Sequence, residues 1–599
     1  TLFNKLKNNN LLVLSKRIRF LLIIFTFCLV MLSVRFFYLQ IIEGEVLKNQ
    51  REKNINTFEY TYPKRGRIIS RDNEVLVEDE KIFSVAIDLE QKPSIKSIKL
   101  LSEIFQDKLE QIEIESIVKK SIASGNQEIV LSKLSLEQLS KFLVRNNELN
   151  GFSILENYKR VYNSHPSIFH VLGHLGYINQ SDEKYFNNRI EGYNSKLWQK
   201  VGKSGLERVY ENELTGTHGK RYFQRNARGT KKILTKEDEF VEGQDLFISI
   251  SFEAQKFAYD LLDGKQGAIV VIDLDDFSIP VAVSAPSISA NDLSGISSKQ
   301  YAELLEDNSR PLFNRAFMGL YPPGSTIKPL LSIFSLGQNY TNWEETIFDD
   351  GFFRFEEEQR IFNAWKEGGH GITDLEKALV ESSNPFFMNL ATRFQKESLE
   401  EFLFSASFGT RLCIDCYPHQ FSPLINDSWK QKNFGRNLFK GDLINLGIGQ
   451  GYMQITPLHL SLIAAMVANK GKYKLPYLSE ALNQKEFFLN QNLDGSDWEK
   501  LNQALIDVVY SRNGTAFRVN PGELRLAGKS GTSQIVDIKS REEYETIREN
   551  PALRDHAVFI GYAPYDNPRY AISVVVENGE GGGSVAGPIA RDVLEVLLK

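Results

Sequence analysis

The side chains best suited to covalent chemistry occur in three short motifs. The chain carries, in this order, Ser325-Thr326-Ile327-Lys328, Ser382-Ser383-Asn384 and Lys529-Ser530-Gly531-Thr532. A serine hydroxyl is a weak nucleophile at its own pKa, so it needs a base within hydrogen-bonding reach. A lysine three residues later in a helix lies on the same face. The first motif therefore predicts that Ser325 is a nucleophile and that Lys328 takes its proton.

Spacing alone does not identify these motifs, because the chain repeats it elsewhere. Ser116/Lys119 repeat the first spacing, Ser124/Asn126 the second, and Lys203-Ser204-Gly205 the third. Ser325, however, follows a Pro-Pro-Gly turn and opens an apolar helical stretch, whose terminal N–H groups can help to bind an oxyanion. Ser116 lies in a charged amphipathic stretch, which is typical of a solvated helix face.

Further segments accompany the motifs along nearly the whole chain. They are Arg65-Gly66, Gly202 to Glu207, Tyr210-Glu211, Asn314-Arg315-Ala316, Trp429 to Lys432, Gly447 to Tyr452, Asn513 to Ala516 and Gly581 to Gly583. With the three motifs, they resemble the class B, monofunctional penicillin-binding proteins. The tryptophan-containing segment and Ser382 to Phe387 favour the elongation-specific type, penicillin-binding protein 2, over the division type.

The resemblance implies a role for each motif residue. Ser382 would relay a proton between the two lysines to the leaving amine, and Asn384 would hydrogen-bond the substrate's amide. Lys529 adds a second cation, which favours a neutral Lys328. Taken singly, Ser382 is also typical of a helix cap, Asn384 of a turn and Lys529 of an exposed edge strand.

The third motif is expected to bind the substrate, through Ser530, Gly531 and Thr532. The hydroxyls of Ser530 and Thr532 would hold the terminal carboxylate of the acyl donor. The backbone N–H groups of Ser325 and Thr532 would form the oxyanion hole. Gly447 to Tyr452 and Gly581 to Gly583 are expected to shape the cleft, although glycine turns explain them equally.

The reaction implied by the resemblance is D,D-transpeptidation of peptidoglycan during cell elongation and cell-shape maintenance. Ser325 would attack a stem peptide, D-alanine would leave, and an amine of a neighbouring stem would resolve the acyl-enzyme. β-Lactams would mimic the donor and stall there, and no cofactor is expected. A β-lactamase or antibiotic sensor, a D,D-carboxypeptidase and a non-catalytic scaffold that activates a glycosyltransferase remain alternatives. Hydrolysis of the antibiotic, use of water as acceptor, and absence of an adduct would distinguish them.

Length and charge agree with this interpretation. The chain has 599 residues, 42% of them hydrophobic, which is enough for two cores and an anchor. Its formal net charge of −5 gives no basic field that would indicate nucleic acid.

A membrane anchor is expected at residues 20–42. The apolar run from Phe20 to Val34 continues after Arg35 to Ile42, and Arg35 can extend its charge to the interface. Basic residues before the run place the N-terminus in the cytoplasm and the remainder outside the inner membrane. A cleaved signal peptide is the alternative, but no small-x-small cleavage site follows.

The expected order is a cytoplasmic tail (1–19), the anchor (20–42), a non-catalytic pedestal (43–241) and a transpeptidase domain (242–599). The pedestal alternates strands with charged helices, which predicts an α+β fold. In the last domain, buried strands at 267–273 and 281–283 and at 556–562 and 570–577 enclose a mostly helical region. We therefore expect an antiparallel sheet flanked by helices, with a helical lobe.

Two clusters have side chains that could bind a metal ion, but we expect neither to bind one. Cys413 and Cys416 form a Cys-x-x-Cys pair near His419, which permits a disulfide, a metal site or a redox pair. An exported compartment and the lack of a second Cys/His cluster favour a disulfide or simple packing. Asp349 and Asp350 with His370 are a second possible group, for which no further ligand follows.

The expected partners are peptidoglycan stem peptides, β-lactams, a RodA-like membrane glycosyltransferase and other elongation-complex proteins. No glycosyltransferase domain fits between the anchor and the pedestal, so another protein would polymerise the glycan. The anchor and pedestal are expected to contact that polymerase.

Overall fold

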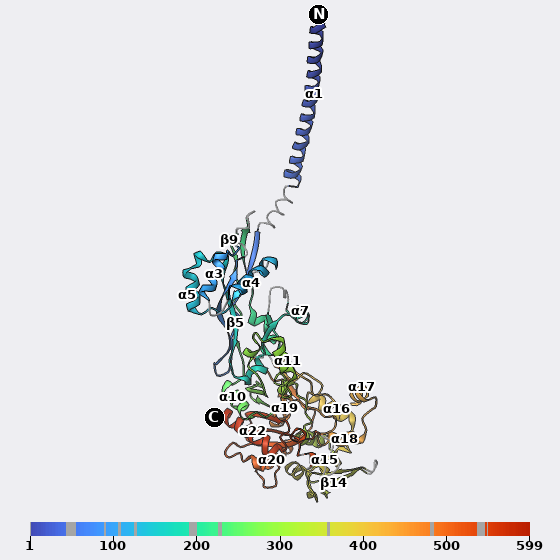
Figure 1. The fold of residues 1–599 in the computed structure, drawn as a ribbon. Helices are drawn as coiled ribbons and strands as arrows, with labels where there is room; N and C mark the ends of the chain where they lie inside the picture. Colours follow the sequence, from blue (N-terminus) through green and yellow to red (C-terminus); the bar gives the residue numbers. More distant parts are fainter. Residues whose placement is uncertain are drawn as a thin grey trace. The chain divides into compact units, whose positions relative to one another are not determined.

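The chain forms two compact units that are interleaved in sequence (Figure 1). The computed structural model describes residues 2–43, 56–88, 92–105, 110–124, 128–190, 200–225, 231–355, 360–479, 484–535, 546–547 and 549–599. The first unit contains residues 1–64, 81–157 and 216–242, and the second contains 65–80, 158–215 and 243–599. The expected domains are consecutive instead, and their boundaries stay a prediction.

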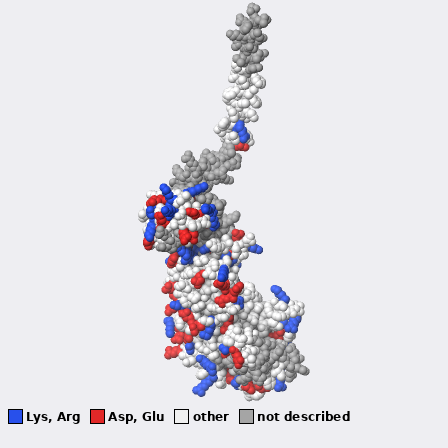
Figure 2. Space-filling model, in the orientation of Figure 1, with Lys and Arg blue, Asp and Glu red and all other residues white. Residues whose placement is uncertain are grey.

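The N-terminal segment is one long helix, α1 (Leu2–Phe37), followed by a π-helical turn, η1 (Tyr38–Ile42). Its segment Ile18–Ile42 has a mean hydropathy of 2.5 and is long and apolar enough to cross a membrane. Figure 2 shows most of this segment free of charged side chains. Its apolar side chains are exposed, for example Phe27 at 67%, as expected of a surface that lipid covers.

The first unit combines a small sheet with helices, two of which begin at serine N-caps. Ser94 and Ser135 each form a capping box, which starts the helix that follows. The apolar faces pack around Phe142 and Leu101, both fully buried. The elements are β1 (Asn56–Thr61), β8 (Gly219–Arg225), β9 (Lys231–Asp238), β4 (Ile129–Leu131), α3 (Ile95–Ile104), α4 (Gln111–Ser124) and α5 (Leu136–Val144).

Two long strands, β3 (Val75–Ile87) and β5 (Phe152–Tyr162), begin in one unit and end in the other, which explains why the units interleave. Within the second unit, β3 pairs with β2 (Ile68–Ile69), and β2 pairs with β10 (Leu246–Phe247). Short elements accompany them, namely α6 (Phe169–Leu172), β6 (Leu175–Tyr177), α7 (Gln180–Asn187), β7 (Lys200–Gly202), α8 (Gly205–Val209) and α9 (Glu211–Thr215).

A buried ionic network ties these segments of the second unit together. Arg65 donates to Glu207 at 2.7 Å and to Glu211 at 2.9 Å, and Arg160 donates to Glu207 at 2.8 Å. Burial alone would raise the pKa of Glu207, but the two guanidinium groups lower it below its usual range. The Arg65-Gly66 and Glu207 segments therefore form one structural unit, although they lie far apart in sequence.

The second unit is built on a five-stranded antiparallel sheet in the order β12-β11-β21-β20-β19. Its strands are β11 (Gly267–Asp273), β12 (Val281–Ala285), β19 (Ala527–Ser533), β20 (His556–Ala563) and β21 (Tyr570–Val576). Alternate residues face opposite sides, so Val270 packs in one core and Val271 in the other. The helix α19 (Pro457–Ala468) covers one face, and α10 (Phe252–Asp260) and α22 (Gly587–Leu598) cover the other.

The region between the strands is mostly helical, as expected. Besides α19, its α-helices are α11 (Ser298–Glu306), α12 (Arg315–Met318), α13 (Lys328–Gly337), α14 (Leu375–Val380), α15 (Asn384–Ala391), α16 (Lys396–Ser405), α17 (Asp427–Phe434), α18 (Lys440–Leu446) and α20 (Gly495–Tyr510). Three short ribbons interrupt them, β13 (Ile347–Asp349) with β16 (Gly371–Thr373), β14 (Phe352–Phe355) with β15 (Arg360–Asn363), and β17 (Lys472–Lys474) with β18 (Glu486–Phe488). The fold class expected from the sequence is confirmed.

Cys413 and Cys416 are joined as a disulfide, and both are buried. Between them, the Asp415 carboxylate accepts hydrogen bonds from the backbone N–H groups of Leu478 and Ser479. Of the alternatives considered for this Cys-x-x-Cys pair, the structure shows the disulfide.

Candidate active site

Ser325 lies in a tight turn that is pressed against two other segments. It belongs to a 3-10 turn (Gly324–Ile327) that leads directly into α13. Gly324 has a φ of +52°, and a Cβ there would lie 2.4 Å from the Thr532 carbonyl oxygen. The Gly324 N–H also donates to the Gly449 carbonyl at 2.9 Å. Only glycine fits this conformation and this contact, so the turn places Ser325 beside the strand of the third motif.

Lys328, one turn further on, is fully buried and reaches the second motif. Its Nζ donates to Asn384 Oδ1 at 2.8 Å, to the Ser382 carbonyl at 3.0 Å and to Ser382 Oγ at 3.2 Å. Burial and then the charge of Lys529 lower the pKa of Lys328 well below its usual value. A lowered pKa favours the neutral amine, whose free lone pair is what a general base requires.

The second motif begins α15 and carries local strain. Ser383 caps the helix by accepting a hydrogen bond from the Phe386 N–H at 3.3 Å, and Pro385 suits the first turn. Ser382, immediately before it, has a φ of +60°, which is unfavourable for a residue with a Cβ. This backbone conformation brings the carbonyl and the hydroxyl of Ser382 to the same lysine.

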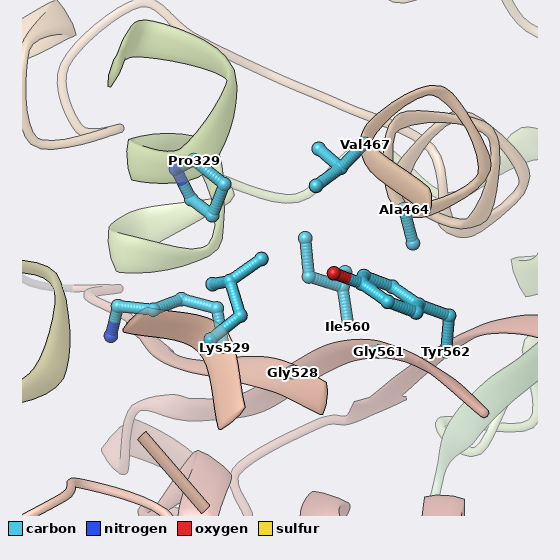
Figure 3. Close-up of a pocket in the computed structure, with 9 residues that line it drawn as sticks. Pro329, Ala464, Val467, Gly528, Lys529, Ile560, Gly561 and Tyr562 are labelled. Atoms are coloured by element: carbon cyan, nitrogen blue, oxygen red, sulfur yellow. The ribbon is translucent and has the colours of Figure 1, made fainter. Parts of the chain in front are cut away.

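Lys529 is also fully buried, on β19, and burial lowers its pKa to about 7. Its Nζ donates to the Ser530 carbonyl at 3.1 Å. Figure 3 shows a small apolar cavity beside its stem, lined by Pro329 of α13, Ala464 of α19 and Tyr562 of β20, with the Lys529 nitrogen extending away from Ala464 and Tyr562. This apolar wall packs against the stem of Lys529, and the whole side chain is buried.

Strand β19 is an edge strand, so its backbone pairs with β20 on one side and with no strand of this sheet on the other. The third motif, Lys529 to Thr532, lies in this strand. Gln450 Nε2 donates to the Thr532 carbonyl at 3.1 Å. In an antiparallel pair, the N–H and C=O of one residue point either both toward the partner strand or both away. Because the Thr532 carbonyl faces Gln450, its N–H also points away from β20. This is the direction that an oxyanion-hole donor needs.

The other two residues of this motif have different environments. Ser530 Oγ donates to Thr515 Oγ1 at 2.8 Å, which fixes its hydroxyl. A Cβ at Gly531 would lie 2.8 Å from Thr326 Cγ2, so the strand approaches the nucleophile turn closely. All three motifs expected from the sequence thus converge on one location.

Several residues of the site were not singled out as functional from the sequence. Asp349 Oδ2 accepts hydrogen bonds from Ser383 Oγ and from His370 Nδ1, each at 2.6 Å. Asp349 and His370 had been considered with Asp350 as a metal cluster, but Asp350 is exposed and the other two bind each other. Trp365 Nε1 donates to the Ser382 carbonyl at 3.4 Å. No local pattern identifies these contacts, because they join distant segments.

Family models and known proteins match this chain over most of its length. Residues 267–595 match the penicillin-binding protein transpeptidase domain, and residues 60–248 match the penicillin-binding protein dimerisation domain. The peptidoglycan D,D-transpeptidase MrdA of Haemophilus influenzae is 32% identical over 581 residues, which cover 95% of this chain and 89% of that protein. The Escherichia coli K12 protein of the same name is 30% identical over 90% of this chain and 86% of its own length.

Solved structures are similar over the same extent. A complex between penicillin-binding protein PBP2 and MreC from Helicobacter pylori matches with a TM-score of 0.77 and 26% identity, covering 91% of this chain and 99% of that one. Pseudomonas aeruginosa PBP2 in complex with WCK 5153 matches with a TM-score of 0.68 and 27% identity, covering 90% of this chain and 97% of that one.

Proposed function

This chain belongs to the family of penicillin-binding transpeptidases, and we propose that Ser325 is the residue on which it forms its acyl-enzyme. The protein is a serine-type D-Ala-D-Ala transpeptidase that cross-links peptidoglycan during cell elongation and binds β-lactams. The observation that carries the assignment of Ser325 is the buried Lys328, which has a lowered pKa and lies one helical turn after it.

Acylation begins when Ser325 Oγ attacks the carbonyl carbon of the penultimate D-alanine. Lys328 takes the hydroxyl proton, and the N–H groups of Ser325 and Thr532 stabilise the oxyanion. When the tetrahedral intermediate collapses, the C–N bond breaks and the terminal D-alanine leaves. Ser382, which contacts Lys328 Nζ at 3.2 Å, passes the proton to the leaving amine. An amine of a second stem peptide then attacks the ester carbon and gives up a proton, which Lys328 returns to Ser325 Oγ as the ester bond breaks. This step forms the cross-link and regenerates the Ser325 hydroxyl.

Substrate binding is assigned to the remaining motif residues. Asn384 presents its amide to the donor peptide, and Ser530, Gly531 and Thr532 line the position of the terminal carboxylate. The Ser530 hydroxyl is oriented by Thr515 at 2.8 Å, which supports this role. Lys529 supplies positive charge there when protonated, and a bound carboxylate would favour its protonated form.

The domains, partners and location are part of the proposal. The dimerisation match at 60–248 supports a pedestal at 43–241, and the match at 267–595 supports a transpeptidase domain at 242–599. The apolar helix supports a single-pass anchor in the inner membrane, with the N-terminus in the cytoplasm and the catalytic domain in the periplasm. The Helicobacter pylori complex supports an MreC-like partner.

A RodA-like glycosyltransferase is proposed as the polymerase that supplies the glycan. If the anchor contacts it, replacing residues 20–42 with an unrelated apolar helix should abolish co-purification of the two proteins. Retained co-purification would place the contact elsewhere.

The assignment of Ser325 is tested by mass spectrometry of the intact protein after incubation with benzylpenicillin. We expect a persistent adduct in the wild type and none in Ser325→Ala. Ser309→Ala, which alters a half-buried loop serine outside the site, is the control and should acylate normally. An adduct that disappears quickly with drug hydrolysis would favour a β-lactamase, and no adduct in the wild type would favour a scaffold.

A further inference from the structure

We propose that Asp349 is a positioning residue that holds the loop Ser382–Asn384 against Lys328, through its hydrogen bonds to Ser383 and His370. The inference rests on the proposed function of this loop. Asp349 is hydrogen-bonded to Ser383 and His370, and its charge also partly offsets the lowering of the Lys328 pKa.

The carboxylate of Asp349 is the centre of a buried hydrogen-bond cluster. Asp349 ends β13, and its side chain is fully buried. Its Oδ2 accepts from Ser383 Oγ and from His370 Nδ1, each at 2.6 Å, and its Oδ1 accepts from the Gly351 N–H at 3.0 Å. Such short, charge-assisted bonds are the strong ones in proteins. The carboxylate is thus held by three donors from three segments.

The carboxylate remains ionised in this environment. Burial alone would raise the pKa of Asp349, but the hydrogen bonds from Ser383 and His370 lower it below its usual value. A buried charge with fixed partners resists displacement, because moving any partner would leave the charge uncompensated. Ser383 is therefore anchored to the protein interior rather than only capping its own helix.

Ser383 lies between Ser382 and Asn384, which are both residues of the site. Its neighbour Ser382 has a φ of +60°, and such backbone strain persists only where surrounding contacts hold it. The Ser382 and Ser383 carbonyls accept from Lys328 Nζ at 3.0 and 3.3 Å. If Ser383 moved, the strained residue could relax, and Lys328 would lose several acceptors together.

His370 and Trp365 provide a second contact with the same loop. His370, bound to Asp349, has its ring centroid 5.8 Å from that of Trp365. The Trp365 indole in turn donates to the Ser382 carbonyl at 3.4 Å. Asp349 and His370 together thus support Ser383 directly and Ser382 through Trp365.

The test is the rate of acylation by benzylpenicillin in Ser383→Ala. We expect the rate constant for acylation to fall at least about tenfold, because displacement of a positioned group by a fraction of an ångström has effects of this order. The affinity of the initial non-covalent complex should change less than the acylation rate constant, since the residues that bind the carboxylate are untouched and only the Asn384 contact moves with the loop. Ser383→Thr retains a hydroxyl donor and should recover most of the rate.

Thr456→Ala is the matched control for loss of a helix cap. Thr456 is buried and caps α19 by accepting from the His459 N–H at 3.2 Å, as Ser383 caps α15. We expect it to lower the melting temperature without changing the acylation rate constant. If Thr456→Ala slows acylation as much as Ser383→Ala, or if Ser383→Ala acylates at the wild-type rate, the inference is wrong.

A double-mutant cycle distinguishes Asp349 from other partners of Ser383. If Ser383 acts through Asp349, then Ser383→Ala should cause little further loss in an Asp349→Ala background. Additive losses would contradict the inference, and the single Ser383 variants decide the question if Asp349→Ala does not fold. A wild-type protein that forms no adduct on Ser325 would instead refute the proposed function, which is a separate outcome.

Discussion

Lys328 and Lys529 are two fully buried lysines that lie in one site without a carboxylate hydrogen-bonded to either amine among the described residues. Burial and the charge of Lys529 both lower the pKa of Lys328, and burial lowers the pKa of Lys529 to about 7. Protonating one amine therefore makes protonation of the other less favourable. The pair keeps one lysine neutral as a base while the other can carry charge.

A pH dependence follows from this arrangement. Because the neutral form of Lys328 is the base, acylation should slow as the pH falls through its lowered pKa. Lys529→Met removes the neighbouring charge, so the pKa of Lys328 should rise and the acid limb should move to higher pH. The measurement is the acylation rate constant for benzylpenicillin across the neutral range.

The control for this experiment is Lys500→Met, which removes a half-exposed lysine of α20. Its acid limb should coincide with that of the wild type. A limb that moves to lower pH in Lys529→Met, or that does not move, would show that Lys529 does not set the pKa of Lys328.

At the scale of elements, the site depends on how closely three backbone segments approach. The turn before α13 contacts both β19 and the glycine-rich segment after α18. Gly449 has a φ of +69°, and a Cβ there would lie 2.2 Å from the Gly324 carbonyl oxygen. Within the segment Gly447 to Tyr452, the contact with the nucleophile turn thus requires glycine at position 449.

Gly449→Ala should therefore displace the turn that carries Ser325. We expect acylation by benzylpenicillin to fall at least about a hundredfold, because misplacement of a reacting group by about 1 Å has an effect of this size. The measurement is the same adduct kinetics, with circular dichroism to confirm folding.

Gly435→Ala is the matched control at this scale. Gly435 has a φ of +70°, nearly that of Gly449, but a Cβ there would meet nothing within 4 Å. It should lose about 1 kcal/mol of stability from the left-handed conformation and keep its acylation rate. Equal losses in the two variants would mean that backbone strain, and not the contact, explains the effect.

At the scale of the whole molecule, the proposed topology separates the ends of the chain by a membrane. The apolar segment Ile18–Ile42 is the only described helix with the length and hydropathy of a span. We expect protease added to intact spheroplasts to digest the compact units and to leave peptides from residues 1–19 protected. Those peptides should disappear only after the membrane is permeabilised.

The same preparation tests the alternative of a cleaved signal peptide. A mature protein whose N-terminus lies after Ile42 and which is released without detergent would contradict the anchor. Digestion of residues 1–19 in intact spheroplasts would contradict the proposed orientation.

The sequence by itself determined the three motifs, the long apolar helix, the family and the antiparallel fold class. These properties are encoded locally, in residue order, in a continuous apolar run and in strands and helices with recognisable periodicity and caps. Ser325 and Lys328, for example, share one helical turn, so the spacing and the Pro-Pro-Gly turn before them indicate their relation.

Only the tertiary structure decided what surrounds those residues. Asp349 bonds Ser383 across 34 positions, Gln450 bonds Thr532 across 82, and Arg65 bonds Glu207 across 142. Such pairs leave no periodic signal, and each partner alone has an ordinary local explanation. Their meaning arises when burial removes water, because a buried polar group must then be satisfied by whichever segment the fold brings to it.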